Sequence, residues 1–284
     1  MTILTSKREL ARVLISPYTL LTSSLRSMPN FIIIGAAKCG TTSLYKYLIQ
    51  HPNIKSGLQK EPSFFNTYFE KGPIWYRANF PINRQNFITG EASPGYFCYS
   101  PAPQRIANLI PSIKLIVLLR NPVDRVYSLY YHNLKHSGNK DTLPFEQAIK
   151  KEAERLDNKL RKIINDEKNY DRKDYYFLHK KYYHYAYLRR CIYIDYIKHW
   201  MQIFPKDQFL ILQSEDLFKY PQKTYAQVLN FMNLPYYSLQ KYRKYNPNQY
   251  QQMNTCTRNY LIDYFKPHNQ MLYEYLARDF DWNK

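Results

Sequence analysis

The sequence predicts an α/β fold in which helices flank a central, mostly parallel sheet. Two features of the 284-residue chain point to this class: short apolar, β-branched runs that suit buried strands, and amphipathic segments between them. From residue 31 onward the two kinds of segment alternate, which is typical of βαβ units. In such sheets ligands bind at the carboxyl ends of the strands, so residues at those ends are the first candidates for a site.

Four apolar runs predict strands. The first, Phe31–Ile34, is a short run of large apolar residues of the kind found in a buried parallel strand. The most strongly apolar run is Ile113–Leu119, and Arg120 follows it directly. The full set of predicted strands covers residues 31–34, 87–92, 113–119 and 209–212.

Six segments predict helices. In the first, Leu44, Tyr47 and Leu48 lie on one face, and the helix ends before Pro52, because proline disfavours helical geometry in the preceding residue. Pro122 stands in the first turn of a later helix, where its missing N–H costs nothing. The predicted helices cover residues 41–50, 122–136, 144–169, 193–204, 225–232 and 261–276.

We expect one domain over residues 31–284 and an N-terminal extension over residues 1–30, since neither a repeat nor a low-complexity linker divides the chain. No stretch approaches the roughly 18–20 apolar residues of a membrane-spanning helix. Ser16 and Pro17 interrupt the apolar run Leu14–Leu21, which argues against a signal peptide. A peripheral contact of the extension with a membrane surface stays open.

The charge balance points to anionic partners. The chain has 41 Lys+Arg and 22 Asp+Glu, a net charge of +19, which attracts nucleic acid, anionic glycans, anionic lipid headgroups or a phosphorylated cofactor. A basic surface without a specific partner is the alternative. Recognisable nucleic-acid-binding patterns are absent, so nucleic acid is not expected. Four widely separated cysteines argue against a disulfide scaffold or a structural zinc site and favour a reducing compartment.

A glycine-bounded loop joins the first strand to the first helix. The segment Gly35–Ser43 reads Gly-Ala-Ala-Lys-Cys-Gly-Thr-Thr-Ser, and a loop of this kind points backbone N–H groups and a helix start at one spot, which binds phosphate. Its glycine spacing resembles a P-loop. However, Thr41 follows Gly40, and the lysine is Lys38, inside the loop. ATP with Mg²⁺ is therefore not expected, because the P-loop lysine and its neighbouring hydroxyl are misplaced. An ordinary strand–turn–helix corner with a surface lysine is the alternative.

This loop resembles the 5′-phosphosulfate loop of the sulfotransferases that use 3′-phosphoadenosine 5′-phosphosulfate (PAPS). The resemblance is to the branch of heparan sulfate N- and 3-O-sulfotransferases and their bacterial relatives. It implies the P-loop-like sulfotransferase fold. It also implies in-line sulfuryl transfer to a hydroxyl or amine without a metal, which leaves the 3′,5′-bisphosphate PAP as the product of PAPS. Other matching segments, in chain order, are Lys60–Phe65, Gly90–Phe97, Lys114–Ser128, Glu215–Leu217 and Asn269–Trp282.

The resemblance implies a role for each residue of the loop. Lys38 would contact the 5′-phosphosulfate and its bridging oxygen, where a fixed cation stabilises the growing negative charge. Cys39 would line the cofactor site as a small filler. Backbone and hydroxyl donors would come from Gly40, Thr41, Thr42 and Ser43.

The resemblance also places the 3′-phosphate of the cofactor on Arg120 and Ser128. The planar fork of an arginine at a strand end suits a phosphate, and a serine one or two helical turns later adds a hydroxyl. Arg125 is undecided between a phosphate contact and a surface salt bridge to Asp124 or a glutamate.

Glu61 matches the candidate catalytic base of the family, since an attacking hydroxyl or amine must lose a proton. Lys60 would hold Glu61 ionised or contact the sulfonate. Two departures concern the acceptor: Ser63 stands where the 3-O-sulfotransferases have His, and Ala92 where they have Lys. The cofactor site is thus expected to be kept while the acceptor site differs.

Near the C-terminus the Lys-Gly-Arg run of the glycan-modifying branch is missing, and Arg243, Tyr250 or Arg258 are candidate substitutes. Cys191 replaces a family glycine, which leaves a cofactor role for Tyr193 open.

His132 and His136 lie one turn apart on a predicted helix and could form a metal pair. Without a third ligand at suitable spacing they are expected to be surface residues.

We expect a sulfotransferase whose acceptor is a carbohydrate: a polysaccharide, oligosaccharide or glycolipid. A P-loop kinase or nucleotidase and a basic nucleic-acid-binding protein are the alternatives. The lack of an N-terminal span resembles bacterial cytoplasmic members of the family. The sequence does not predict an oligomeric state.

Overall fold

The computed structural model describes residues 15–84, 86–136, 142–155, 185–245 and 250–283. The chain forms two compact units, each made from two stretches of sequence. The first comprises residues 1–119 and 199–246, and the second comprises residues 120–198 and 247–284. Helix α11 (Tyr193–Met201) contributes residues to both. The domain boundary expected at residue 31 stays a prediction.

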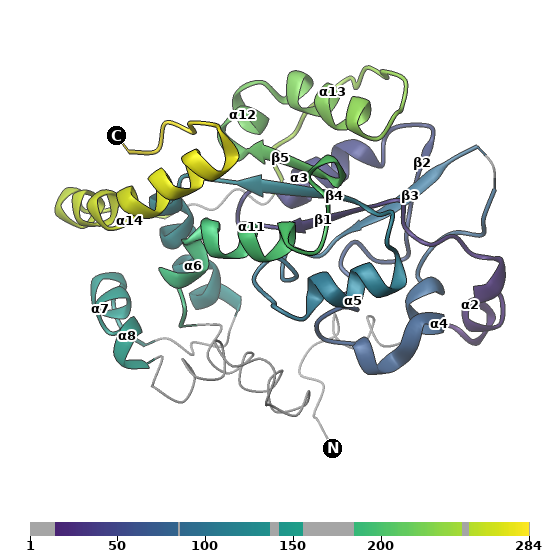
Figure 1. The fold of residues 1–284 in the computed structure, drawn as a ribbon, viewed down its shortest axis with the longest axis horizontal. Coiled ribbons are helices and arrows are strands. Elements are labelled where there is room, and N and C mark those ends of the chain that lie inside the picture. Colours follow the sequence, from purple (N-terminus) through teal and green to yellow (C-terminus); the bar gives the residue numbers. More distant parts are fainter. Residues whose placement is uncertain (1–14, 85, 137–141, 156–184, 246–249, 284) are drawn as a thin grey trace. The chain divides into compact units, whose positions relative to one another are not determined.

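The first unit contains a five-stranded parallel sheet with strand order β2-β3-β1-β4-β5 (Figure 1). This confirms the predicted α/β class and all four predicted strands. The strand β2 was not predicted, because its three residues carry no apolar run. The bounds are β1 Phe31–Gly35, β2 Ile54–Ser56, β3 Ile88–Ala92, β4 Lys114–Leu119 and β5 Phe209–Gln213.

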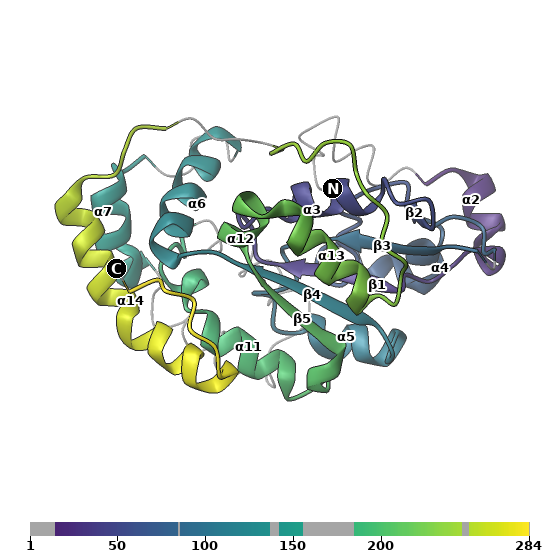
Figure 2. The ribbon, with the colours of Figure 1, turned by 90° about the horizontal axis from the view of Figure 1, so that it is seen from above.

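The order of the strands decides which face each connecting helix covers. The chain crosses the sheet in one direction from β1 to β2 and in the opposite direction from β3 to β4. Since parallel crossovers are right-handed, α3 (Thr41–Leu48) and α5 (Ala102–Leu109) belong on opposite faces. Figures 1 and 2 show this arrangement, with α13 (Pro221–Phe231) beside α3.

The central strands of the first unit are covered on both faces. In β1, residues Phe31–Ile34 are fully buried, and so are residues Leu115–Leu119 of β4. Continuous burial of this kind explains why these strands are apolar throughout rather than alternating, as expected for a parallel sheet. These buried strands therefore hold the loops that follow their carboxyl ends in fixed positions.

Residues 15–30 pack against the first unit. They contain α2 (Pro17–Leu21) and a 3₁₀ turn, η1 (Ser23–Leu25). The buried Arg26 donates a hydrogen bond of 2.7 Å to the carbonyl of Phe80 and accepts one from Arg77 at its own carbonyl. Among the described residues, no helix is both long enough and apolar enough to cross a membrane.

Four further short elements of the first unit were not predicted from the sequence. They are η2 (Phe69–Lys71), α4 (Gly72–Arg77), η4 (Lys206–Gln208) and α12 (Ser214–Lys219).

The second unit is helical. Helix α6 (Pro122–His136) has the predicted bounds and contacts α14 (Thr255–Leu276), which begins six residues earlier than predicted because Asn254 caps it. The predicted helix 144–169 is instead two short helices, α7 (Phe145–Lys150) and α8 (Glu152–Arg155); residues 156–169 lie outside the described part. A 3₁₀ turn, η3 (Arg189–Cys191), precedes α11.

Candidate functional site

The loop after β1 turns sharply at the carboxyl end of the sheet. The amide of Ala36 donates a 2.8 Å hydrogen bond to the carbonyl of Leu118, which ties the loop to the end of β4. The amide of Cys39 donates to the carbonyl of Ala36 at 3.2 Å and closes the turn. Lys38 lies at the tip with φ +70°, a left-handed conformation that is uncommon for lysine. Cys39 is buried, and its expected role as a filler of the cofactor site stays a prediction.

Gly40 ends this loop in a conformation that favours glycine. Its φ is +93°, and a Cβ atom there would lie 3.0 Å from Leu217 and 3.0 Å from Phe218, both on α12. A larger residue would therefore be strained by its backbone and crowded by α12. The packing of α12 over the loop fixes the point at which α3 begins.

The start of α3 offers donors to an anion. The N-cap residue Gly40 has no side chain to cap the helix, so within the described part of the chain the first-turn amides of Thr41, Thr42 and Ser43 have no capping side chain. The hydroxyl of the buried Ser43 accepts a 3.1 Å hydrogen bond from the amide of Tyr245. Backbone donors at a helix start, hydroxyls and a nearby lysine form a set that fits a phosphate or sulfate group.

A second candidate segment follows β2. Lys60 and Glu61 form an ion pair there, and both side chains are partly exposed. The carbonyl of Lys60 accepts a 2.9 Å hydrogen bond from the amide of Ala92, the last residue of β3. The structure thus holds the Lys60–Glu61 pair against the carboxyl end of β3, in the same unit as Lys38.

Ser63 and Ala92, the two positions that depart from the family pattern, lie on this same edge. Ser63 has a left-handed backbone, with φ +53°, and its carbonyl accepts hydrogen bonds from the amides of Thr67 and Tyr68. Ala92 is fully buried. Neither residue brings a charge or an imidazole to the edge.

Glu91 is a buried carboxylate to which the sequence analysis gave no role. It lies on β3 with no exposed surface, and its oxygens accept hydrogen bonds from Tyr76, Ser93 and Tyr96. Burial raises the pKa of its carboxyl group from 4.5 to about 7; the three hydrogen bonds lower it, and the charge of Glu61 raises it. Glu91, Ser93 and Tyr96 all lie in the segment Gly90–Phe97 that matches the family, but the sequence did not indicate that Tyr76, on α4, also donates to this carboxylate.

The raised pKa of Glu91 predicts how stability depends on pH. Between pH 4.5 and 7 the folded chain holds a proton on Glu91 that the unfolded chain has released, so stability falls as pH rises through this window. A pKa change from 4.5 to about 7 corresponds to roughly 3 kcal/mol. Denaturant unfolding of the wild type and of Glu91→Gln should show a steeper loss in the wild type between these pH values. Parallel curves would mean that Glu91 keeps an ordinary pKa.

In the second unit, Arg120 directly follows β4, and Tyr193 contacts its backbone. The hydroxyl of Tyr193 donates a 2.7 Å hydrogen bond to the carbonyl of Arg120 and accepts one of 3.4 Å from its amide. Tyr193 itself is buried at the start of α11. Ser128 lies in α6 and is 2% exposed.

Arg125 is not a surface residue, so of its two alternatives the surface salt bridge is wrong, while the phosphate contact stays a prediction. Its side chain is fully buried, donates to the carbonyl of Arg190 and lies 5.2 Å from the centre of the Tyr193 ring. Asp124 pairs instead with Arg258, at 2.6 Å. Arg125 therefore ties α6 to the turn before α11.

The sequence offered three candidate substitutes for the missing Lys-Gly-Arg run: Arg243, Tyr250 and Arg258. Each of them contacts different residues. Arg258 is engaged with Asp124, and the ring of Tyr250 stacks on that of Tyr131 with centroids 4.9 Å apart. Arg243 belongs to the first unit, where its carbonyl accepts a hydrogen bond from Tyr47. Their proposed roles stay predictions.

The residues that the structure describes contain no group of three or more His, Cys, Asp or Glu side chains able to hold a metal ion. His132 is partly exposed, and the side chain of His136 lies outside the described part.

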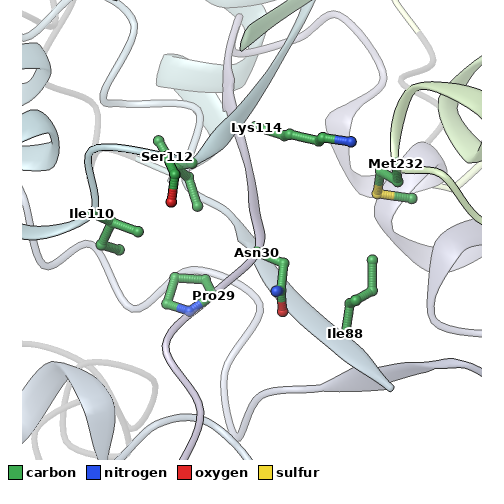
Figure 3. A pocket seen from close by; sticks show the side chains of 8 residues that line it. Pro29, Asn30, Ile88, Ile110, Ser112, Lys114 and Met232 are labelled. Carbon is green, nitrogen blue, oxygen red and sulfur yellow. The ribbon is translucent and has the colours of Figure 1, made fainter. Parts of the chain in front are cut away.

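Figure 3 shows a pocket of about 230 Å³ in the first unit. It is lined by Asn30, Ile88 and Lys114, at the amino ends of β1, β3 and β4. The candidate loop of the first unit, with Lys38, lies at the opposite, carboxyl end of β1. The amino group of Lys114 donates to the carbonyl of Phe231, so the charge in this pocket has a structural partner.

Comparisons with known proteins agree on one family. A family model described as "Sulfotransferase domain" matches residues 28–273, a range that includes every candidate from Lys38 to Ser128. The "Membrane-associated sulfotransferase kil1" of Dictyostelium discoideum is 29% identical over 317 residues, covering 91% of this chain and 67% of that protein. The human "Heparan sulfate glucosamine 3-O-sulfotransferase 6" is 26% identical over 281 residues, covering 90% and 74% respectively.

A solved structure shares the fold over the same length. The crystal structure of a sulfotransferase from Alicyclobacillus acidocaldarius superposes with a TM-score of 0.70 and 26% identity, covering 91% of this chain and all of the other.

Proposed function

The chain belongs to the sulfotransferase domain family and is a sulfotransferase enzyme, and from this premise we propose that it transfers a sulfuryl group from PAPS to a carbohydrate hydroxyl or amine. The observation that carries the proposal is the uncapped start of α3 behind the left-handed turn at Lys38 and Gly40. This donor set suits the 5′-phosphosulfate and lacks the lysine and hydroxyl arrangement that ATP with Mg²⁺ needs.

In this proposal the donor's 5′ end binds to the loop and the first turn of α3. Thr41, Thr42 and Ser43 offer amides, and Gly40 leaves the backbone accessible because it has no side chain. Bound PAPS supplies the activated sulfuryl group. Lys38 provides a cation for the bridging oxygen that gains charge as the sulfur–oxygen bond breaks, and such a preorganised charge lowers the barrier without a metal.

We assign the 3′-phosphate to Arg120 and Ser128. Support comes from the motif match and from the position of Arg120 directly after β4, whose end contacts the loop through Leu118 and Ala36. Tyr193 fixes the backbone of Arg120 from both its amide and its carbonyl. We therefore propose that Tyr193 orients the backbone of Arg120; a direct cofactor role for Tyr193 stays open.

Glu61 is proposed as the base. The acceptor oxygen or nitrogen forms a bond to sulfur, the bond from sulfur to the 5′-phosphate oxygen breaks, and Glu61 takes the proton that the acceptor loses. Lys60 forms an ion pair with Glu61 and is proposed to contact the sulfonate.

A carbohydrate acceptor is supported by the relationship to the human heparan sulfate enzyme and by the +19 net charge, which suits an anionic glycan. Ser63 and Ala92 lack the imidazole and amine found in the 3-O-sulfotransferases, so we propose an acceptor different from theirs. The cytoplasmic location expected from the sequence stays a prediction.

The test is transfer of radiolabelled sulfate from PAPS to a panel containing a neutral polysaccharide, N-desulfated heparan sulfate, a glycolipid and a simple phenol. We expect label on at least one carbohydrate and none on the phenol, measured by chromatography of the products. Label on the phenol alone would refute the carbohydrate assignment.

A further inference from the structure

Glu91 occupies an unusual position for a charged side chain. It is fully buried on β3, one residue before the end of the strand, and its hydrogen-bond partners among the described residues are all hydroxyl groups. A buried carboxylate is costly unless donors surround it. The groups that bind the Glu91 carboxylate should therefore explain why it occupies a buried position.

Three hydroxyl groups supply those donors. Tyr76 donates at 2.6 Å, Ser93 at 2.5 Å and Tyr96 at 3.3 Å. Ser93 and Tyr96 are 2% and 0% exposed. Glu91 thus fixes the orientation of each hydroxyl group, because the hydroxyl proton points to a carboxylate oxygen of Glu91.

Two of these hydroxyls also accept from the segment that carries Glu61. The amide of Ser63 donates to the Ser93 hydroxyl at 3.3 Å, and the amide of Phe65 donates to the Tyr96 hydroxyl at 3.4 Å. A third bond comes from the strand itself, through the amide of Ala92 and the carbonyl of Lys60 at 2.9 Å. The segment 60–65 is therefore bound at three points to the end of β3.

We propose that Glu91 is a positioning residue for sulfuryl transfer: through Ser93 and Tyr96 it holds the backbone of residues 60–65 and so aims the carboxylate of Glu61. We call Glu91, Ser93 and Tyr96 the Glu91 clamp. The inference rests on the proposed function of Glu61. Aromatic packing of Phe64 and Phe65 also anchors the segment. Packing of these rings constrains the backbone dihedral angles of Ser63 less than the hydrogen bond from its amide to Ser93 does.

Ser93→Ala tests the clamp. It removes the acceptor for the Ser63 amide and should lower kcat roughly ten- to a hundredfold, the cost of misplacing a catalytic group, while KM for PAPS changes little. Tyr96→Phe, which removes the other link, should act in the same direction. Ser93→Thr keeps the hydroxyl and should recover part of the loss.

The matched control is Thr89→Val, an isosteric change on the same strand. The buried Thr89 hydroxyl donates to the carbonyl of Lys55 at 2.7 Å and has no hydrogen bond to residues 60–65. We expect it to lower the melting temperature about as much as Ser93→Ala and to leave kcat near the wild-type value. Equal kcat in Ser93→Ala and Thr89→Val would overturn the proposal.

Hydrogen exchange separates the clamp from the proposed function. Exchange at the amides of Ser63 and Phe65 should be faster in Ser93→Ala and in Tyr96→Phe respectively, whether or not the protein transfers sulfate. Unchanged exchange at both amides would overturn the clamp, whereas a wild type without transfer from PAPS would refute the proposed function alone.

Discussion

Replacing Lys38 by alanine is expected to lower kcat for sulfuryl transfer roughly a hundred- to a thousandfold, the usual cost of removing one preorganised charge from a transition state. Lys38 lies at the tip of a turn that two backbone hydrogen bonds hold, next to a helix start without a side-chain cap. The backbone that carries Lys38 is therefore held in place before the donor binds. The measurement is steady-state transfer of labelled sulfate at saturating PAPS.

Lys46→Ala is the matched control, because Lys46 is exposed on α3 and its loss changes the net charge by the same amount. Circular dichroism and thermal unfolding should show both variants folded. If Lys38→Ala keeps a kcat within roughly threefold of Lys46→Ala, the lysine has no role in the transition state.

Glu61→Gln is expected to lower kcat roughly a hundred- to ten-thousandfold, the range typical of a lost general base. The glutamine has nearly the same shape but cannot take the acceptor's proton. Binding of PAP should stay near the wild-type value, because the proposed donor contacts lie in the loop and on Arg120 and Ser128. Calorimetry with PAP and single-turnover transfer measure the two effects separately.

Glu70→Gln is the control for this change, since Glu70 is exposed in η2 and carries the same charge. An equal loss of turnover and of PAP affinity in Glu61→Gln would remove Glu61 as the base and make it a binding residue.

The strands that carry the site could be predicted because burial on both faces makes them apolar along their whole length. Phe31–Ile34 and Leu115–Leu119 are fully buried, and their pattern was visible in the sequence. The positions of the Lys38 loop and of Arg120 could be predicted from these same strands, because each lies where a predicted strand ends. The three-residue strand β2 gave no such signal.

Contacts between distant segments could not be predicted. Gly40 was expected to let a phosphate approach, but α12, more than 170 residues later, also requires a glycine there. Glu91 accepts a hydrogen bond from Tyr76 on α4, a residue outside the matching segment Gly90–Phe97. A surface salt bridge was one of two alternatives for Arg125, yet its side chain is buried and donates to the carbonyl of Arg190. In each case tertiary packing sets the environment of the side chain.

The most direct test of the central claim is calorimetric titration of the whole chain with PAP and with ADP, each with and without Mg²⁺. A PAPS-dependent sulfotransferase with Lys38 inside the loop should bind PAP tightly regardless of Mg²⁺ and bind ADP weakly, because ADP lacks the 3′-phosphate assigned to Arg120 and Ser128. Absence of PAP binding, or a preference for ADP that depends on Mg²⁺, would contradict the account and favour a nucleotide-hydrolysing or phosphoryl-transferring P-loop enzyme.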